Sequence, residues 1–278
     1  MLATNRGAAA YLIGCLALGA MSGAAKAETR LNAHYSITMT GVSIGQMSWA
    51  IDLFASTYTA SASGKASGAL SVLVNGDGRI ATRGVIEGDR PRPTFFSSNV
   101  IEDNVVTGLQ MTFENGAVKT LRTDQPPPKS DRIPVSEADR RGVVDPLTAM
   151  LIPAPPGANG LMPAHCNRVL AIFDGQRRYD LALSFKRMDK MKIDIGYGGP
   201  VLVCAVVLKP IAGYRADSML VKYVSGRHGM EIWFAPIAGT PLAAPVRLVM
   251  PTAVGTLEIA ADRFEAALVE PVNGAPKP

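Results

Sequence analysis

The chain has few cysteines, few aromatic residues, few charges and, beyond its N-terminus, no long hydrophobic run. Its 278 residues include 3 cysteines, and 6% are aromatic and 18% charged, against roughly 25% charged residues in an average globular domain. This composition excludes a disordered tail, a coiled coil and the dense basic surface of a nucleic-acid-binding protein. Removing residues 1–27, which contain two basic and no acidic residues, leaves 26 basic and 23 acidic residues, a net charge of +3. We therefore expect no nucleic-acid partner.

The N-terminus has the features of a cleavable export signal. Arg6 precedes an apolar stretch over 8–20, and Ala25 and Ala27 supply the small residues that signal peptidase requires. We predict cleavage after Ala27, which makes the mature protein periplasmic, soluble and without a transmembrane segment. Lipoprotein anchoring at Cys15 is the first alternative, but only about seven apolar residues precede it. An uncleaved anchor is weaker still, because glycine and alanine dilute a span that needs about 20 strongly apolar residues.

Cysteine usage agrees with export. Removal of Cys15 with the signal leaves Cys166 and Cys204, and an even pair in an oxidising compartment is most simply a disulfide. Closing that loop would stabilise the fold by roughly 4 kcal/mol through the entropy of the unfolded chain. A redox or metal pair is the alternative, but the chain has no Cys-x-x-Cys motif. On a strand, His165 would also point to the opposite face from Cys166.

Alternation of apolar and polar residues predicts β-strands through most of the mature chain. Two turn signals stand out: Gly41–Gly45 between the first two strands, and Asn115-Gly116, typical of a type I′ turn. The run 201–208 is apolar on both faces, as in a strand covered on either side. The predicted strands are 31–39, 47–53, 58–62, 79–87, 94–101, 105–113, 117–122, 166–173, 177–186, 201–208, 218–224, 230–235, 245–250 and 254–264.

The predicted fold is mainly β: a large curved antiparallel sheet, open barrel or β-spiral with one or two short helices. The helices are expected at about 66–74 and 145–152, the second with Asp145 as N-cap and Pro146 at its first position. The predicted segments are a signal peptide over 1–27, an N-terminal β half over 28–122, a Pro-rich loop and short helix over 123–160, a C-terminal β half over 161–265, and a flexible tail over 266–278.

Several short motifs, taken in order, resemble a known family. They are Tyr35, the segment 41–45, Asp145-Pro146-Leu147, Phe173-Asp174-Gly175, Tyr179-Asp180-Leu181, the cysteine pair, 210–213 and Ile232-Trp233. In this order they resemble the alphaproteobacterial members of the family catalogued as domain of unknown function 3108, over almost all of the mature chain. The resemblance implies a periplasmic β-protein without an assigned activity, cofactor or catalytic residue. In architecture alone the chain is similar to half-barrel lipoprotein carriers, and such an analogy does not establish function.

Motifs that would carry chemistry are few. Gly76–Ala81 has the letters of a nucleotide-binding G-x-G-x-x-A motif, but residues from Arg79 onward alternate like a strand, where that motif needs a helix. No G-x-S-x-G, S-x-x-K or H-E-x-x-H motif occurs. The histidines, His34, His165 and His228, lack metal-ligand spacing, and surface or strand-edge positions are expected. We therefore assign no catalytic, cofactor-binding or metal-binding residue.

Three weaker features have both a functional and a structural interpretation. Glu102-Asp103 could act as an acid pair, although acidic residues at the end of a strand normally form a solvated turn. Ten methionines of the mature chain could line an adaptable apolar cavity or simply fill the core. A basic cluster could contact an anionic surface, or its lysines could protect a strand edge from aggregation. The cluster is Arg177, Arg178, Lys186, Arg187, Lys190 and Lys192.

The leading functional hypothesis is a non-enzymatic periplasmic envelope protein. It would support envelope integrity or hold an apolar ligand such as a lipid between its two halves. One alternative is an enzyme whose catalytic residues are dispersed along the chain, and another is a scaffold for an envelope protein complex. An apolar cavity would favour the first hypothesis, a polar cluster in a cleft the second, and an exposed strand edge with a large apolar patch the third.

Overall fold

A computed structural model describes residues 28–66, 76–102, 105–124, 126, 130–155, 160–225 and 229–269. The predicted signal peptide, with Cys15, Ala25 and Ala27, lies outside these residues. So does most of the predicted helix at 66–74, whose first residue, Ala66, instead ends a strand.

The described chain is mainly β, as predicted, and its strands belong to one large sheet that is not closed. The strands are β1 (Glu28–Met39), β2 (Val42–Leu53), β3 (Thr57–Ala66), β4 (Gly76–Glu87), β5 (Arg90–Glu102), β6 (Val105–Glu114), β7 (Ala117–Thr123), β8 (Ile152–Pro153), β9 (Arg168–Phe173), β10 (Arg178–Lys192), β11 (Ile195–Gly196), β12 (Gly198–Ala212), β13 (Met230–Pro236), β14 (Leu242–Thr252) and β15 (Gly255–Val269).

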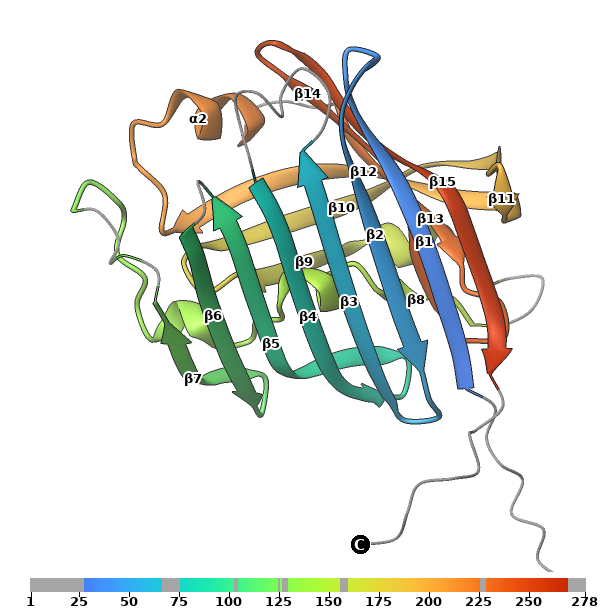
Figure 1. Ribbon diagram of the computed structural model, residues 1–278, viewed down its shortest axis with the longest axis horizontal. Coiled ribbons are helices and arrows are strands. Elements are labelled where there is room, and N and C mark those ends of the chain that lie inside the picture. Colours follow the sequence, from blue (N-terminus) through green and yellow to red (C-terminus); the bar gives the residue numbers. More distant parts are fainter. Residues whose placement is uncertain are drawn as a thin grey trace, which may run out of the picture.

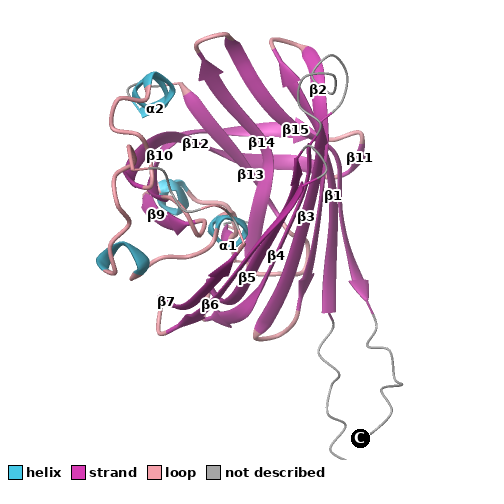
Figure 2. Cartoon of the chain, turned by 60° about the vertical axis from the view of Figure 1, so that its left-hand side comes forward, coloured by secondary structure: helices cyan, strands magenta, loops and turns pink. Residues whose placement is uncertain are grey.

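Strand β1 lies in the middle of the sheet and joins the two halves of the chain. It pairs antiparallel with β2 on one side and with β15 on the other. The order from edge to edge is β7-β6-β5-β4-β3-β2-β1-β15-β14-β13-β12-β10-β9, with β8 paired to β14 and β11 paired in parallel to β15. The sheet curls so that β9, β10 and β12 lie behind β3 to β6 (Figures 1 and 2). The N- and C-terminal halves therefore face each other across an interior.

Period-two alternation places the main core in that interior. On β1 to β3 the inward residues Tyr35, Trp49, Ile51 and Tyr58 are buried, while their chain neighbours are half-buried or exposed. Residues of β12 to β15 and of the short helix α1 (Pro146–Ala149) pack against them. The predicted core faces of the first strands are therefore correct, because each of these strands buries only one face.

Strand β12 is covered on both faces, as its apolar run predicted. Val201 and Val203 belong to the interior core, whereas Leu202 and Cys204 belong to a second cluster. That second cluster includes Ile152 and other residues of the chain between α1 and β9. A strand buried on both faces needs apolar residues at every position, which explains the unbroken run.

Residues 141–144 link the two edges of the sheet. Val143 donates its backbone N–H to the Gly116 carbonyl beside β7 (3.2 Å), and Val144 donates to Ala171 on β9 (2.9 Å). The Val143 side chain is buried in a third cluster with Phe173 and residues of β5 and β6. Backbone groups at the two edges of the sheet are thus hydrogen-bonded to residues 141–144, although β7 and β9 do not pair directly.

Several predicted elements need correction. The segment 218–224, expected as a strand, is helix α2 (Met219–Ser225), because Ser218 accepts a hydrogen bond from the Val221 N–H and begins a helix. The strand expected from Cys166 begins at Arg168, after the 3₁₀-helix η3 (Pro163–Cys166). A second 3₁₀-helix, η2 (Ala138–Arg140), lies in the loop.

One of the two predicted turns lies at its expected position, and the other is shifted. Asn115 and Gly116 have φ of 52° and 72°, the left-handed pair that a type I′ turn requires. The first turn, expected at 41–45, is instead centred on Thr40 and Gly41, and β2 begins at Val42. Strand β15 also continues to Val269, into the segment expected as a tail.

Candidate functional site

An apolar cavity of about 260 Å³ lies between the two halves of the sheet and α1. Its walls come from β1 to β4 on one side, from β10 and β13 to β15 on the other, and from α1 and the residue that follows it. The lining residues are Tyr35, Met47, Trp49, Ala62, Ile80, Pro146, Leu147, Met150, Tyr179, Ile232, Pro245, Arg247, Leu248 and Ile259. This is the arrangement that the apolar-ligand hypothesis expected.

The few polar groups of the cavity wall are mostly satisfied within the protein. Tyr35 donates its hydroxyl to the Pro245 carbonyl (2.7 Å), and burial raises the pKa of this phenol well above its usual range. Arg247 is paired through Nε with Glu258 (2.8 Å), and its guanidinium lies 4.9 Å from the ring centre of Trp233. Most of the cavity surface therefore offers only van der Waals contact to a ligand.

A buried hydrogen-bond network holds α1 in the interior. Asp145, which is fully buried, accepts hydrogen bonds through Oδ1 from the backbone N–H groups of Leu147 (2.9 Å) and Thr148 (3.0 Å). Its Oδ2 accepts from the hydroxyls of Thr148 (2.5 Å) and Thr82 (2.9 Å). The Tyr58 hydroxyl lies 2.6 Å from the Thr148 hydroxyl.

Burial dominates the electrostatics of this network. It raises the pKa of Asp145, despite hydrogen bonds that act in the opposite direction. Burial also raises the pKa of Tyr58, and the nearby Asp145 carboxyl adds to that increase. The donors that bond Asp145 come from α1 and from Thr82 on β4. We therefore interpret the network as structural support for the cavity wall.

A larger and more polar hollow, about 880 Å³, lies over β1 to β5 and β15. It contains a histidine–carboxylate pair in which His34 Nδ1 is 2.7 Å from Asp262 Oδ1. The other ring nitrogen, Nε2, is 3.3 Å from Gln46 Oε1. Small polar side chains from neighbouring strands line the hollow, among them Ser48, Ser61, Ser63, Ser97 and Asn99.

This pair has only part of a catalytic arrangement. A histidine oriented by a carboxylate can act as a base, but it needs a nucleophile or a substrate proton within hydrogen-bond reach. Ser48 stands opposite His34 in the β1–β2 register. Within the described part of the chain, His34 has hydrogen bonds to Asp262 and Gln46 and none to a serine.

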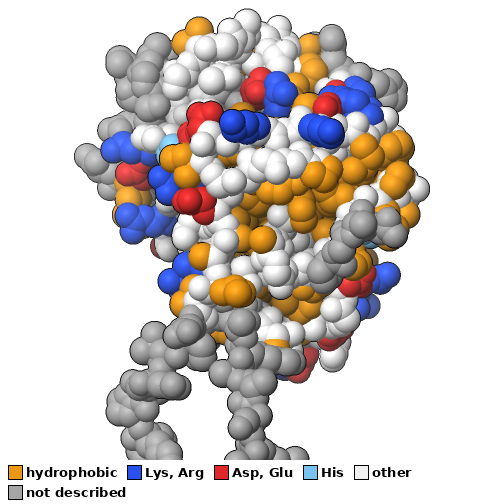
Figure 3. Space-filling model, turned by 90° about the vertical axis from the view of Figure 1, so that its right-hand side faces the viewer, with side chains coloured by type: hydrophobic (Ala, Val, Ile, Leu, Met, Phe, Trp, Pro, Cys, Tyr) orange, Lys and Arg blue, Asp and Glu red, His pale blue; other side chains and the backbone are white. Residues whose placement is uncertain are grey.

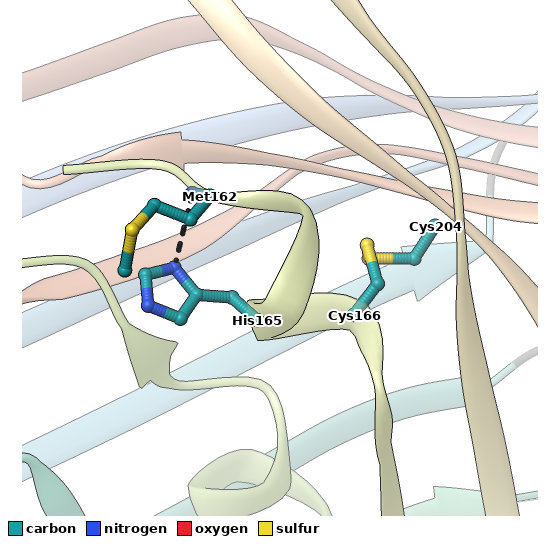
Figure 4. The surroundings of a disulfide bond; sticks show 4 residues. All are labelled: Met162, His165, Cys166 and Cys204. Carbon is teal, nitrogen blue, oxygen red and sulfur yellow. Dashed lines mark hydrogen bonds between the residues drawn. A yellow bond between two sulfur atoms is a disulfide. The ribbon is translucent and has the colours of Figure 1, made fainter. Parts of the chain in front are cut away.

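The cysteine pair forms the predicted disulfide, between η3 and β12, with Cα atoms 5.5 Å apart (Figure 4). His165 is buried and turned away from the sulfur atoms, and its Nδ1 accepts a hydrogen bond from the Met162 N–H (3.3 Å). Burial lowers the pKa of this imidazole, and Arg168 lowers it further. The separation of His165 from Cys166 was expected for a strand, but a 3₁₀-helix causes it.

The basic cluster lies along β10 and in the turn before it, and most of it is paired with carboxylates. Arg177 pairs with Asp174, Arg178 with Asp180, Lys186 with Glu231, and Arg187 with Asp189 and Glu231. No ion pair involves Lys190 or Lys192 within the described part of the chain. The pairing reduces the charge available to an anionic surface, and the role of the six residues stays a prediction.

The remaining candidate residues do not converge. Gly76–Ala81 lies on β4, so the strand expected from Arg79 is confirmed, and it begins three residues earlier, at Gly76. His34 is half-exposed on a central strand, whereas His165 is buried, so the surface or edge position expected for His165 was wrong; His228 and Asp103 lie outside the described residues. No group of three or more potential metal ligands occurs in the described ranges.

Sequence reasoning missed the cavity residues and the His34–Asp262 pair. His34 and Asp262 are 228 residues apart in the sequence, and they lie at a register shift between β1 and β15. A period-two pattern shows which face of a strand is apolar, but it does not show which strands are neighbours. The methionine content of the mature chain was the signal for an apolar cavity, and Met47 and Met150 line it.

Comparison with known proteins shows a family but no activity. No curated protein matches the chain. A crystal structure of a beta-barrel-like protein of domain of unknown function DUF1849 from Brucella abortus is 9% identical, with a TM-score of 0.45, over 87% of this chain and 98% of that one. None of the described helices has the length and hydropathy to span a membrane. The family model described as protein of unknown function (DUF3108) matches residues 34–262, so the chain belongs to that family, as its motifs indicated.

Proposed function

We propose that this protein is a non-enzymatic periplasmic protein of the cell envelope that holds an apolar ligand, such as a lipid, in its interior cavity. The observation that supports this most directly is the apolar wall of the cavity, to which both sheet halves and α1 contribute. Ligand sites are typically concave, mostly apolar and about 300–1,000 Å³ in volume. A cavity of about 260 Å³ suits a small molecule or part of an acyl chain.

Two further features support this proposal. Met47 and Met150 line the cavity, and their flexible thioethers can adapt to ligands of different shape. The Cys166–Cys204 disulfide is typical of an oxidising compartment such as the periplasm. The enzyme hypothesis has weaker support, because the His34–Asp262 pair lacks a hydrogen-bonded nucleophile within the described residues.

The test is native mass spectrometry and lipid extraction of protein purified from the periplasm. We expect a small molecule to co-purify with the wild-type protein. Ala62→Phe would place a large side chain in the cavity, whereas Ala81→Phe, on the next strand, would place it in the polar hollow on the other face. Ligand loss in A62F but not in A81F supports the proposal, and a wild-type protein free of small molecules contradicts it.

A scaffold function is the second candidate, because hydrophobic side chains form a broad band on the side of the molecule that carries β11 and β15 (Figure 3). Contiguous apolar surface of this kind often marks an interaction site. The same native mass spectra distinguish the two functions. A protein partner would add a large mass that survives in A62F, whereas a cavity ligand would add a small mass that does not.

A further inference from the structure

The larger hollow, about 880 Å³ on the outer face of β1 to β5, is built from polar and small side chains at paired positions of adjacent strands. One row crosses the five strands and consists of His34, Ser48, Ser63, Arg79 and Asn99. The row beside it on β2 to β5 has smaller side chains, Ala50, Ser61, Ala81 and Ser97. Figure 1 looks onto this face, with the rest of the sheet behind it.

The hydroxyls of this hollow have hydrogen-bonding capacity that the fold does not use. Ser48, Ser61, Ser63 and Ser97 line the hollow, and none of their side chains bonds to another group within the described residues. A hydroxyl both donates and accepts, as the hydroxyls of a sugar do. The ring of Trp49 belongs to the core on the other face, so the hollow has no stacking platform of the kind that single-stranded nucleic acid needs.

The charged groups at the β15 end of the hollow are paired within the protein. Asp262 lies 2.7 Å from His34 Nδ1, and Arg263 pairs with Glu265 (2.6 Å). An acidic group of a ligand would meet a carboxylate there, beside cations that are already engaged. This end is therefore suited to neutral hydroxyls.

Arg79 lies towards the other end of the hollow, on β4, and its side chain is exposed. It forms no ion pair within the described ranges, and Asp77, two positions before it, stands opposite Lys65 in the β3–β4 register. Three inter-strand spacings, about 14 Å, separate His34 from Arg79. A ligand that reaches both residues is therefore extended, with hydroxyls along its length and its acidic group at Arg79.

We propose that this hollow binds a short acidic oligosaccharide, which lies across β1 to β4 with its carboxylate at Arg79 and its hydroxyls on the two serine-containing rows. Arginine binds a carboxylate through two parallel N–H groups, which fixes the direction of the ligand. The site lies on the opposite face of the strands from the apolar cavity, so it does not depend on the ligand proposed for that cavity.

The test is isothermal titration calorimetry of the mature protein with 3′-sialyllactose, which carries one carboxylate, and with maltotriose, a neutral trisaccharide. We expect 3′-sialyllactose to bind more tightly. Arg79→Gln should lower the ratio of acidic to neutral affinity by about tenfold, the effect of one hydrogen bond to a charged group. Arg83→Gln is the matched control: Arg83 lies on the same face of β4, outside the hollow and over the Phe95 ring, and its ratio should equal that of the wild type.

A second pair of variants tests the position of the site. Ala81→Phe fills the hollow and should abolish the binding of both sugars, whereas Thr59→Phe, on the same face but outside the hollow, should leave it unchanged. An unchanged affinity ratio in R79Q, binding that survives in A81F, or no binding of either sugar would each overturn this inference. Arg79 is exposed, so R79Q tests it even if A81F does not fold. None of these results bears on the apolar ligand, which A62F tests on the other face.

Discussion

The buried carboxylate of Asp145 allows a quantitative prediction about the stability of the fold. Its carboxylate is fully buried, caps α1 and accepts hydrogen bonds from two backbone N–H groups and two hydroxyls. Asp145→Ala removes all of these acceptors at once. We expect this single substitution to be among the most destabilising in the protein.

The size of this loss in stability follows from the groups that donate hydrogen bonds to Asp145. Loss of the N-cap costs about 1 kcal/mol. The N–H groups of Leu147 and Thr148 would remain buried and unpaired, at about 1–3 kcal/mol each. The Thr82 hydroxyl can still donate to the Phe95 carbonyl, 3.0 Å away, so it adds little. Because the N-cap cost counts these same two N–H groups, the sum is about 2–6 kcal/mol, a large part of the 5–15 kcal/mol by which domains are usually stable.

Asp145→Asn tests the reason for that loss. Asparagine caps helices as well as aspartate does and keeps one oxygen for the two N–H groups. Its amide can also donate to the Thr82 and Thr148 hydroxyls, so we expect a cost of about 1 kcal/mol. Urea unfolding followed by tryptophan fluorescence measures both variants. Asp139→Ala, which removes a solvent-accessible acceptor for the Ser136 N–H and hydroxyl, should cost less than about 1 kcal/mol.

Two outcomes would refute this reasoning. If D145A lies within about 1 kcal/mol of the wild type, the network does not hold α1 in place. If D145N is as unstable as D145A, the negative charge and not the hydrogen-bonding capacity of Asp145 is what the fold requires.

Three other predictions concern stability. Replacing both Cys166 and Cys204 by alanine should lower the free energy of unfolding by about 4 kcal/mol, and the wild type in reductant should approach the double variant. Because burial raises the pKa of Asp145, the folded state keeps a proton that the unfolded chain loses above about pH 4. The stability difference between wild type and D145N should therefore shift against the wild type as pH rises from that value; a pH-independent difference would contradict the raised pKa. Gly175→Ala should cost about 2 kcal/mol or more, since φ is +99° and the new Cβ would lie 2.2 Å from Leu109 Cδ1. Gly88→Ala, with φ of +67° and no atom within 4 Å, should cost about 1 kcal/mol, and equal losses would show that the Leu109 contact is unimportant.

Local features of the fold could be predicted from the sequence because local physics determines them. Alternation identified the buried faces of β1 to β3, and the Asn115-Gly116 pair identified its turn. Asp145-Pro146 identified the start of α1. A short segment of mixed apolar and polar residues is different, because its pattern suits a strand or a helix, and 219–225 became a helix through the Ser218 cap.

Long-range features could not be predicted in the same way. The link at 141–144 depends on hydrogen bonds to Gly116 and Ala171, which are distant from each other in the sequence. The position of Trp49 on an apolar face was predictable, but the cavity beside it depends on residues from four or more other strands. A cavity forms where the side chains of several elements leave space unfilled. The periodicity of a single strand does not show where such space lies.

The polar network and the apolar cavity depend on each other through α1. A helix of four residues has no stability of its own, so its position is set by the contacts around it. Asp145 and Thr148 connect it to Tyr58 on β3 and Thr82 on β4, while Pro146 and Leu147 form part of the cavity wall. The network satisfies its polar groups internally, and the cavity wall that α1 contributes is apolar. An apolar ligand would therefore bind to a wall that is already fixed in place, which limits the entropic cost of binding.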